Sequence, residues 1–312
     1  MSLGIVGYAS LDYSTSTPVF HGIDATSILQ RGIVSTTPGI GGIAHIARAA
    51  AATGVDTSAI SWIGPDAQGV QWTESLRAAG CEVSGVAVSG SRSPSATLIE
   101  VGTGGTICLF DPADCHPDRL TDAQVAALRA STCVVLTVSP SSLTDEVMAA
   151  LPESATLVWA VKHDDDAYTP SMLRRLLTRA DVISFSTGER SYVSLGGTAP
   201  ELLVRPGALV VETMGSRGVA WAFGSPDGPV RPGSIPVDAV EAADTTGAGD
   251  TFIGTLAGLA AQSGSLADQT DDAVAAIVAT ASRAAGDLLR SRSASDLSAP
   301  EPQDDSPMKE TL

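Results

Sequence analysis

The chain has 312 residues with a formal net charge of −17, and 44% of its residues are hydrophobic. This length and hydrophobic content suit a single α/β enzyme domain with a large, mainly aliphatic core. The excess of acidic side chains argues against a surface for nucleic acid or an anionic membrane. The N-terminus does not resemble a signal peptide, and no apolar stretch has membrane-spanning length, so we expect a cytoplasmic protein. Four cysteines without Cys-x-x-Cys spacing favour reduced thiols over disulfides or a zinc site.

Strand and helix patterns alternate along most of the chain. Short runs that are apolar on both faces, as in buried parallel strands, occur at residues 3–9, 58–64, 132–138, 156–161, 181–185 and 208–213. Helical patterns occur at residues 43–54, 67–80 and 171–180. This alternation predicts a doubly wound, mostly parallel sheet flanked by helices.

Two regions, residues 13–40 and about 92–118, contain short strands without helices between them. In the second region, residues 95–110 have the pattern of a hairpin around a glycine-rich turn. A phosphate-binding loop is the alternative for that turn, but no helix follows it. We expect the two regions to form a small sheet that covers one end of the core as a lid. The exposed edge of this sheet could pair two subunits in a homodimer.

The end of the chain differs in composition from the rest. Residues 1–290 are predicted to form the single domain. Residues 291–312 are polar, contain three prolines and lack periodicity, so they are predicted to be a tail that is disordered or lies along the surface.

Residues 243–261, ADTTGAGDTFIGTLAGLAA, place small residues directly before a helical pattern. Gly247, Ala248 and Gly249 allow the backbone N–H groups to approach an anion closely. If the helix begins at about Asp250, its first N–H groups and its dipole point at the same place. Asp250 could then accept the proton of a hydroxyl that attacks phosphorus. The alternative is that Asp250 is only the helix cap, although the flanking small residues favour the anion site.

Residues 244–252, DTTGAGDTF, resemble the C-terminal signature of the ribokinase-like family, the phosphofructokinase-B type of sugar and nucleoside kinases. The resemblance implies that Asp250 is the catalytic base and that the turn from Gly247 to Asp250, with Ala248 and Gly249, forms an anion hole. It also implies that Asp244 and Thr246 bind a monovalent cation such as K⁺.

Other segments match the family in chain order, from about residue 4 to residue 290. Residues 7–12, GYASLD, resemble its opening strand, and residues 41–54 resemble its N-terminal signature. The substrate-binding residues that these segments imply are Asp12, Ser10, Gly41, Gly42 and His45. His45 also has an alternative as a buried histidine with a purely structural role.

Two further segments resemble the parts of the family that bind ATP and Mg²⁺. In VVETMGSRGVAW, residues 210–221, the candidate nucleotide contacts are Thr213, Gly215 and Gly218. In DVISFSTGE, residues 181–189, Ser186 and Glu189 stand where the family has Asn-x-x-Glu, so Glu189 would organise Mg²⁺ and the triphosphate through water.

Several positions depart from the family pattern. Ser186 and Ser10 each replace an asparagine, His45 replaces another, and Val138 replaces a glutamate of ribokinase. Because three of these changes fall in the acceptor pocket, they suggest an altered substrate. Lys162 follows a predicted strand, where a surface ion pair is its default role and a phosphate contact the alternative.

We therefore expect ATP-dependent phosphoryl transfer to a hydroxyl of a small sugar. A nucleoside kinase of the same family and a non-catalytic sugar- or nucleotide-binding regulator are the alternatives. A P-loop is excluded because the chain has no Gly-Lys pair, and the first strand lacks the G-x-G-x-x-G of a dinucleotide-binding enzyme.

Overall fold

A computed structural model describes residues 1–30, 38–102, 104–240 and 245–297, with only the backbone of residues 293–297. Its central sheet has nine strands in the order β13-β12-β11-β10-β9-β8-β1-β4-β5. They are β1 Ser2–Val6, β4 Asp56–Ile63, β5 Glu82–Val88, β8 Cys133–Leu136, β9 Thr156–Ala160, β10 Val182–Ser186, β11 Leu209–Thr213, β12 Val219–Phe223 and β13 Val230–Ile235. The strands from β5 to β11 are parallel, whereas β12 and β13 are antiparallel to their neighbours.

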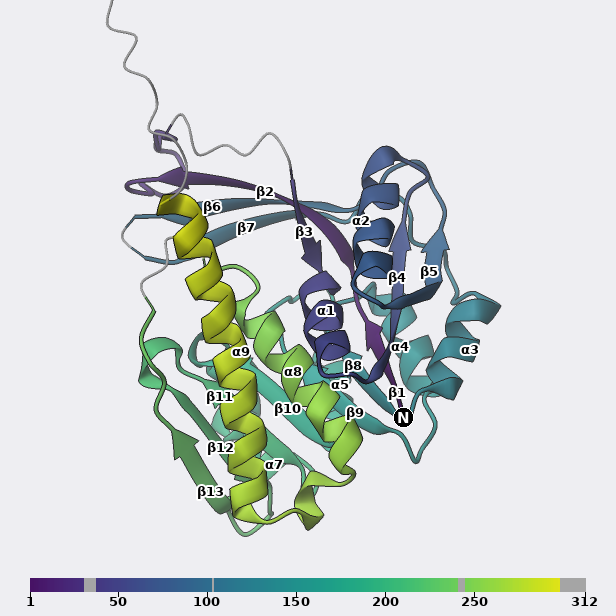
Figure 1. Cartoon of the computed structure of the whole chain (residues 1–312), viewed down its shortest axis with the longest axis vertical. Helices are drawn as coiled ribbons and strands as arrows, with labels where there is room; N and C mark the ends of the chain where they lie inside the picture. Colours follow the sequence, from purple (N-terminus) through teal and green to yellow (C-terminus); the bar gives the residue numbers. More distant parts are fainter. Residues whose placement is uncertain (31–37, 103, 241–244, 298–312) are drawn as a thin grey trace, which may run out of the picture.

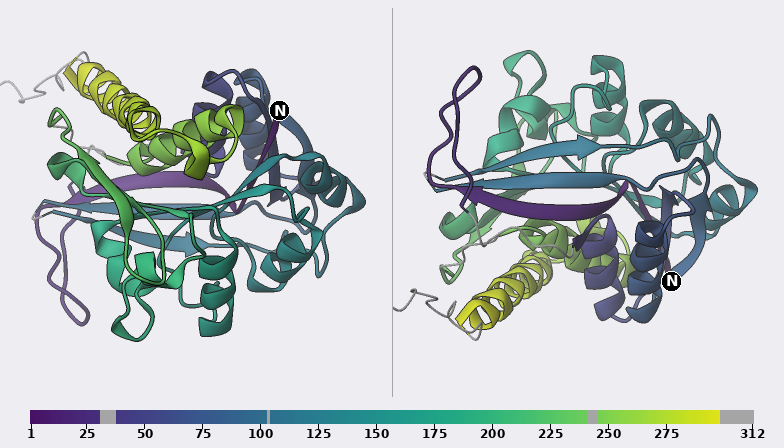
Figure 2. Two further views of the ribbon diagram at one scale, coloured as in Figure 1. Left: turned by 90° about the horizontal axis from the view of Figure 1, so that it is seen from below. Right: turned by 90° about the horizontal axis from the view of Figure 1, so that it is seen from above.

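Helices cover both faces of this sheet (Figure 1, Figure 2). One face carries α1 Ala44–Ala52, α2 Ala67–Ala78, α8 Ala248–Ser263 and α9 Asp271–Leu297. The other carries α3 Asp122–Ala130, α4 Ser141–Ala150, α5 Pro170–Arg179, α6 Arg190–Val193 and α7 Pro200–Leu203. The arrangement confirms the predicted doubly wound sheet, and each face has its own layer of buried aliphatic side chains.

Successive side chains of the central strands point to opposite faces of the sheet and so pack into the two layers of the core in turn. Ile5 of β1 is buried in the layer under α1 and α8, while Val6 is buried in the layer under α3 and α4. Because both faces are covered, the strand sequence is apolar throughout instead of alternating. Because the strands from β5 to β11 are parallel, their C-terminal ends lie at one common edge of the sheet.

Helices α1 and α8 pack so closely that α8 needs small residues. A Cβ atom on Gly254 would lie 2.2 Å from the backbone oxygen of Ile46, and one on Gly258 would lie 2.4 Å from Oγ1 of Thr53. This close contact explains why glycine stands at positions 254 and 258 of α8. It also fixes the first turn of α8 beside the first turn of α1.

A second sheet extends beyond the core (Figure 1). Its four strands have the order β3-β2-β6-β7 and are β2 Ala9–Thr17, β3 Gly39–Gly42, β6 Ser95–Val101 and β7 Thr106–Asp111. β2 follows β1 after two residues, and β6 and β7 form the predicted hairpin. The small sheet thus continues directly from β1, an interior strand of the large sheet. Pairing of two such lids in a homodimer stays a prediction.

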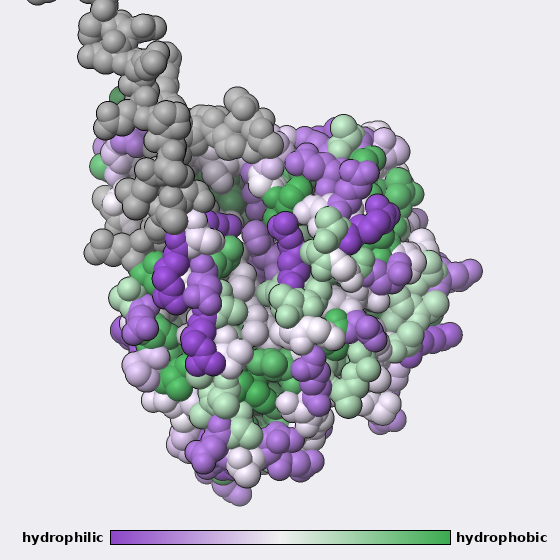
Figure 3. Space-filling view, viewed as in Figure 1, coloured by the Kyte–Doolittle hydropathy of each residue, from purple (hydrophilic) through white to green (hydrophobic). Residues whose placement is uncertain are grey.

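The last helix extends into the segment that the sequence predicts to be a tail. α9 is 27 residues long and runs to Leu297, so it includes the first seven residues of the segment predicted to be a tail. Among the described helices, none combines the length and the apolar composition needed to cross a membrane. Hydrophilic and hydrophobic side chains are interspersed over the face shown in Figure 3.

Candidate active site

The turn before α8 has the backbone of an anion-binding site. Gly247 has a φ of +74°, in the left-handed region, and α8 begins at Ala248. The N–H of Ala248 donates to the oxygen of Thr245 at 3.2 Å. The following N–H groups, of Gly249 and Asp250, belong to the first helical turn, so they have no acceptor within the helix. Together with the helix dipole they can bind an anion.

Asp250 is not the cap of this helix, contrary to one of the two predicted roles. The cap residue is Gly247, and Asp250 is the third residue of α8. The left-handed glycine starts the helix before the aspartate is reached, which frees the carboxylate from a capping bond. Its side chain is 17% exposed and lies 3.1 Å from Nζ of Lys162, at the end of β9. The salt bridge expected for Lys162 therefore forms, and its partner is the candidate base.

His45 lies against the same turn. It is the second residue of α1, and a Cβ atom on Gly247 would lie 2.8 Å from Cγ of its imidazole. Burial lowers the pKa of His45, and the carboxylates of Asp250 and Asp12 oppose this shift. The imidazole is therefore neutral near pH 7, within electrostatic range of one aspartate from α8 and another from the lid. This position is consistent with a substrate contact as well as with packing.

The acceptor-side residues meet where β2 and β3 pair. Oγ of Ser10 donates to Oδ1 of Asp12 at 2.5 Å, which orients the carboxylate. This carboxylate lies directly over Gly41, where a Cβ atom would overlap with it. Gly42 has a φ of +62° and so allows the chain to turn into α1. The structure thus brings Ser10, Asp12 and Gly41 together as a hydrogen-bonding group.

The lid faces this group through β7. Burial raises the pKa of the Cys108 thiol, with a further contribution from Asp12, while Lys162 acts in the opposite direction. Cys108 is therefore near both the acceptor aspartate and the lysine that pairs with Asp250. Cys108 is exposed, so this side of β7 is open to solvent in the structure.

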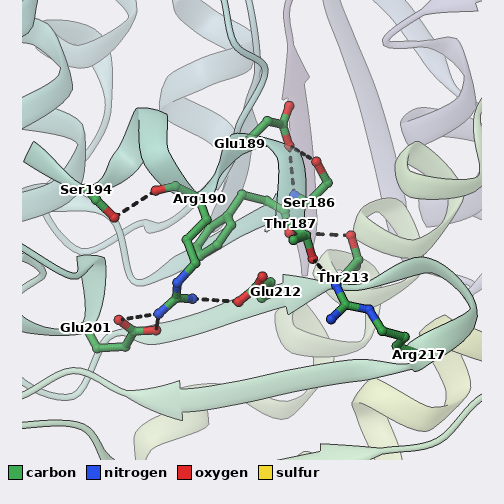
Figure 4. Close-up of polar contacts among 10 residues, drawn as sticks. Ser186, Thr187, Glu189, Arg190, Ser194, Glu201, Glu212, Thr213 and Arg217 are labelled. Atoms are coloured by element: carbon green, nitrogen blue, oxygen red, sulfur yellow. Dashed lines mark hydrogen bonds and ion pairs between the residues drawn. The ribbon is translucent and has the colours of Figure 1, made fainter. Parts of the chain in front are cut away.

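Glu189 is held by the residue that replaces the family's asparagine. β10 ends at Ser186, and the short 3₁₀ helix η1, Thr187–Glu189, follows. The backbone N–H and the hydroxyl of Ser186 both donate to Oε2 of Glu189, at 2.8 Å and 2.9 Å (Figure 4). Serine therefore orients the carboxylate by a short local contact.

Arg190 is a part of the site that the sequence analysis missed. Its guanidinium donates to Glu212 at 2.6 Å and to Glu201 at 3.0 Å (Figure 4). Glu212 precedes Thr213, so Arg190 ties the residue after Glu189 to the end of β11. No local motif signals this contact, because its partners are 11 and 22 residues away.

A cavity of about 700 Å³ lies next to the anion-binding turn, and its volume is within the usual range for small-molecule sites. The predicted nucleotide contacts Thr213, Gly215 and Gly218 line it, as do Ala248 and Gly249. Apolar side chains from β12 to α9 complete the wall: Val219, Ile235, Pro236, Val237, Val240, Phe252 and Leu289. The contribution of α9, which includes Arg283 and Arg290, was not foreseen.

The two predicted monovalent-cation residues are Asp244 and Thr246, and Asp244 lies outside the described residues. The backbone oxygen of Thr246 accepts a hydrogen bond from Nη1 of Arg292 at 2.5 Å. Arg292 thus places a positive charge at this oxygen, and the cation role of the two residues stays a prediction.

Comparison with known proteins identifies the family of the chain. A profile of the pfkB family of carbohydrate kinases matches residues 23–290, most of the chain. The chain belongs to this family. A search of curated proteins returns no match.

Solved structures share the fold of this kinase. Ribokinase from Arabidopsis thaliana, complexed with ribose and ATP, is 22% identical with a TM-score of 0.70, covering 93% of this chain and 92% of that one. Ribokinase from Giardia lamblia is 22% identical with a TM-score of 0.71 and 92% of each chain covered. A nucleoside kinase from Methanocaldococcus jannaschii is 16% identical with a TM-score of 0.67 and 90% of each chain covered.

Proposed function

We propose that the chain transfers the γ-phosphoryl group of ATP to a hydroxyl of a small sugar. The observation that carries this proposal is the start of α8. Its left-handed Gly247 presents first-turn N–H groups next to a large cavity, and the carboxylate of Asp250 lies in the same turn. Phosphoryl transfer needs these two elements side by side, because an anion must be held while a hydroxyl loses its proton.

The nucleotide would occupy the cavity between β11, β13 and α9. Apolar side chains of the lining suit a nucleobase, and the Gly215–Gly218 segment brings backbone close to it. The phosphates would then point to Ala248 and Gly249, which line the same cavity. The ribokinase from Arabidopsis thaliana was solved in complex with ATP, which supports this choice of nucleotide.

The acceptor would bind under the lid, to Asp12, Ser10, Gly41, Gly42 and His45. Asp12 is already oriented by Ser10, so its carboxylate can accept hydrogen bonds from sugar hydroxyls without reorganisation. His45 is neutral and can donate to or accept from another hydroxyl. Asp250 then takes the proton of the attacking hydroxyl as general base. The lid would exclude water from the reaction.

The donor set near the turn fits Mg²⁺ bound through the nucleotide. Mg²⁺ keeps several waters and uses few carboxylates when phosphates are present. Glu189 offers one oriented carboxylate, and no group of three or more potential His, Cys, Asp or Glu ligands exists among the described residues. Glu189 would hold the ion through water, and the ion would neutralise phosphate charge.

A nucleoside acceptor is the second candidate, favoured by an aromatic cluster beside the acceptor strand. The rings of Tyr8 and Phe110 have centroids 4.9 Å apart, and those of Tyr8 and His116 are also 4.9 Å apart. Tyr8 comes two residues before Ser10, and Phe110 belongs to the lid strand β7. Such rings can stack against a nucleobase.

The experiment is a measurement of ADP formation from Mg·ATP over a panel of sugars and nucleosides. A strong stimulation by one class of acceptor is the expected result and distinguishes the two candidates. Nucleotide binding without stimulation by any acceptor would contradict the enzyme and favour the regulator. Each reaction is run in KCl and in choline chloride at equal ionic strength.

A further inference from the structure

Lys162 reaches the candidate reaction site from the C-terminal end of β9. Its Nζ lies 3.1 Å from Oδ1 of Asp250, and its side chain is 50% exposed. The ammonium group therefore contacts the candidate base, while half of the surface of the side chain as a whole is exposed. In open α/β sheets, the C-terminal ends of the strands are where ligands bind.

The ionisable groups around Lys162 come from three different elements. Asp250 raises the pKa of Lys162 most, burial opposes this effect, and Glu189 and Cys108 add to the increase. These groups belong to α8, to η1 and to the lid strand β7. Lys162 is thus protonated at neutral pH and lies among the candidate base, the candidate Mg²⁺ carboxylate and the lid.

If the proposed function holds, this position would lie at the γ-phosphoryl end of the bound nucleotide. The nucleotide cavity is lined by Ala248 and Gly249, whereas neither Asp250 nor Lys162 is among the described residues that line it. The anion-binding turn therefore separates the space for the nucleoside from the place where Lys162 meets Asp250. In the proposed reaction, Asp250 deprotonates the acceptor hydroxyl, and that hydroxyl attacks the γ-phosphorus. Because Lys162 contacts Asp250, Lys162 would also lie near this phosphorus.

We propose that Lys162 is a catalytic residue that contacts the transferred phosphoryl group. The proposal rests on the proposed function. In the step, the bond between the γ-phosphorus and the bridging oxygen breaks, and its electron pair stays on ADP. A bond forms between the acceptor oxygen and the phosphorus, and the acceptor proton passes to Asp250. Lys162 keeps all its protons and shifts its ammonium group from Asp250 to the phosphoryl oxygens.

Arg283 and Arg290 line the nucleotide cavity and Arg292 binds the backbone oxygen of Thr246, whereas Lys162 contacts Asp250 itself. The two lysines of the chain are Lys162 and Lys309, and Lys309 is in the C-terminal segment outside the described residues. The turn at Gly247 supplies only backbone donors, which carry partial charges. A full positive charge near the phosphoryl oxygens stabilises the charge spread over them in the transition state.

The test measures the Kd of Mg·AMP-PNP and of Mg·ADP by calorimetry, so it needs no knowledge of the acceptor. Only the first nucleotide carries a third phosphoryl group. Lys162→Met is expected to raise the Kd of AMP-PNP by about 10-fold, the size of a lost charge-assisted hydrogen bond, and to leave the Kd of ADP within about twofold. Lys162→Arg should retain part of the preference for AMP-PNP, since it keeps the charge.

A double variant separates direct contact from an effect through Asp250. Removing Lys162 leaves the Asp250 carboxylate unpaired, which would itself repel a third phosphoryl group. We therefore expect the loss of AMP-PNP affinity to appear again when Lys162→Met is made in an Asp250→Asn background. With a known acceptor, Lys162→Met should lower kcat by about 100-fold with the acceptor KM within about threefold.

Arg174→Met is the matched control, because Arg174 is exposed on α5 and its removal changes the net charge equally. Both of its Kd values should equal those of the wild type. Equal weakening of both nucleotides by Lys162→Met, or no effect in the Asp250→Asn background, would overturn the role of Lys162 and leave the proposed function standing. A wild type that binds neither nucleotide would overturn both.

Discussion

The imidazole of His45 occupies the space that a side chain on residue 247 would need. A Cβ atom at Gly247 would approach Cγ, Cδ2 and Nδ1 of His45 to between 2.8 Å and 2.9 Å. Helices α1 and α8 thus contact each other at their N-terminal ends, where the ring of His45 packs against the backbone of Gly247. The anion-binding turn and an acceptor contact are parts of one packed unit.

This contact predicts that Gly247→Ala damages both stability and activity. Alanine at a φ of +74° costs about 1–2 kcal/mol of unfolding free energy, and displacement of His45 adds to the cost. The measurement is urea unfolding together with nucleotide affinity. Gly249→Ala is the control for the unfolding measurement alone, because a Cβ atom there meets nothing within 4 Å. A Gly247→Ala variant as stable as the wild type would contradict the packing described.

A second prediction concerns the interface between α1 and α8. Gly254→Ala should lower the free energy of unfolding by about 1–3 kcal/mol, because the new methyl group would press on the backbone of Ile46. In an exposed helix the same change would stabilise by about 1 kcal/mol. Gly286→Ala in α9 is the matched control, since its nearest neighbours are the flexible end of Arg290. Thermal unfolding of both variants gives the sign of each effect.

Most of the fold could be predicted because the central strands are buried on both faces. A strand such as β8, with all four residues buried, has an unambiguous apolar sequence. β13 was missed because its residues alternate between exposed and half-buried and include Pro232 and Gly233, which suggest a turn. The end of α9 was missed because polar, serine-rich residues do not show the apolar periodicity by which helices are recognised.

For the site, sequence reasoning found the residues that act through local backbone and missed those that act over long separations. The turn at Gly247, the group of Ser10 with Asp12, and the pair of Ser186 with Glu189 each lie within a few residues of sequence. Arg292 and Thr246 are 46 residues apart, and only the packing of α9 beside α8 brings them together. Such a contact has no sequence signature.

The bond between Ser186 and Glu189 yields a third prediction. Ser186→Ala removes the hydroxyl that holds Oε2 of Glu189 but keeps the backbone bond. We expect the Mg²⁺ concentration needed for half-maximal activity to rise about 3- to 10-fold, as for loss of one hydrogen bond to a charged group. Thr187→Ala serves as the control at the neighbouring position. An unchanged Mg²⁺ dependence would show that the hydroxyl does not orient the carboxylate.

The hydrogen bond from the Arg292 guanidinium to the backbone oxygen of Thr246 predicts how nucleotide affinity responds to monovalent cations. Since Arg292 already binds the backbone oxygen beside the anion-binding turn, replacing choline by K⁺ should leave wild-type nucleotide affinity unchanged. Arg292→Ala should weaken that affinity by about 10-fold in choline, with partial recovery in K⁺. Arg292→Lys keeps the charge and checks that folding alone is not the cause. Several-fold stimulation of the wild type by K⁺ would refute this expectation.

The most direct test of the central claim compares wild type and Asp250→Asn in acceptor-dependent ADP formation, with the Kd of Mg·AMP-PNP measured in parallel. Asparagine has nearly the same shape but cannot take the proton of the attacking hydroxyl. The account predicts a fall in kcat of about 100-fold or more, on the scale of a lost general base, with unfolding midpoint and nucleotide binding retained. An Asp250→Asn enzyme with near wild-type kcat would contradict the account, because proton transfer would then not depend on Asp250.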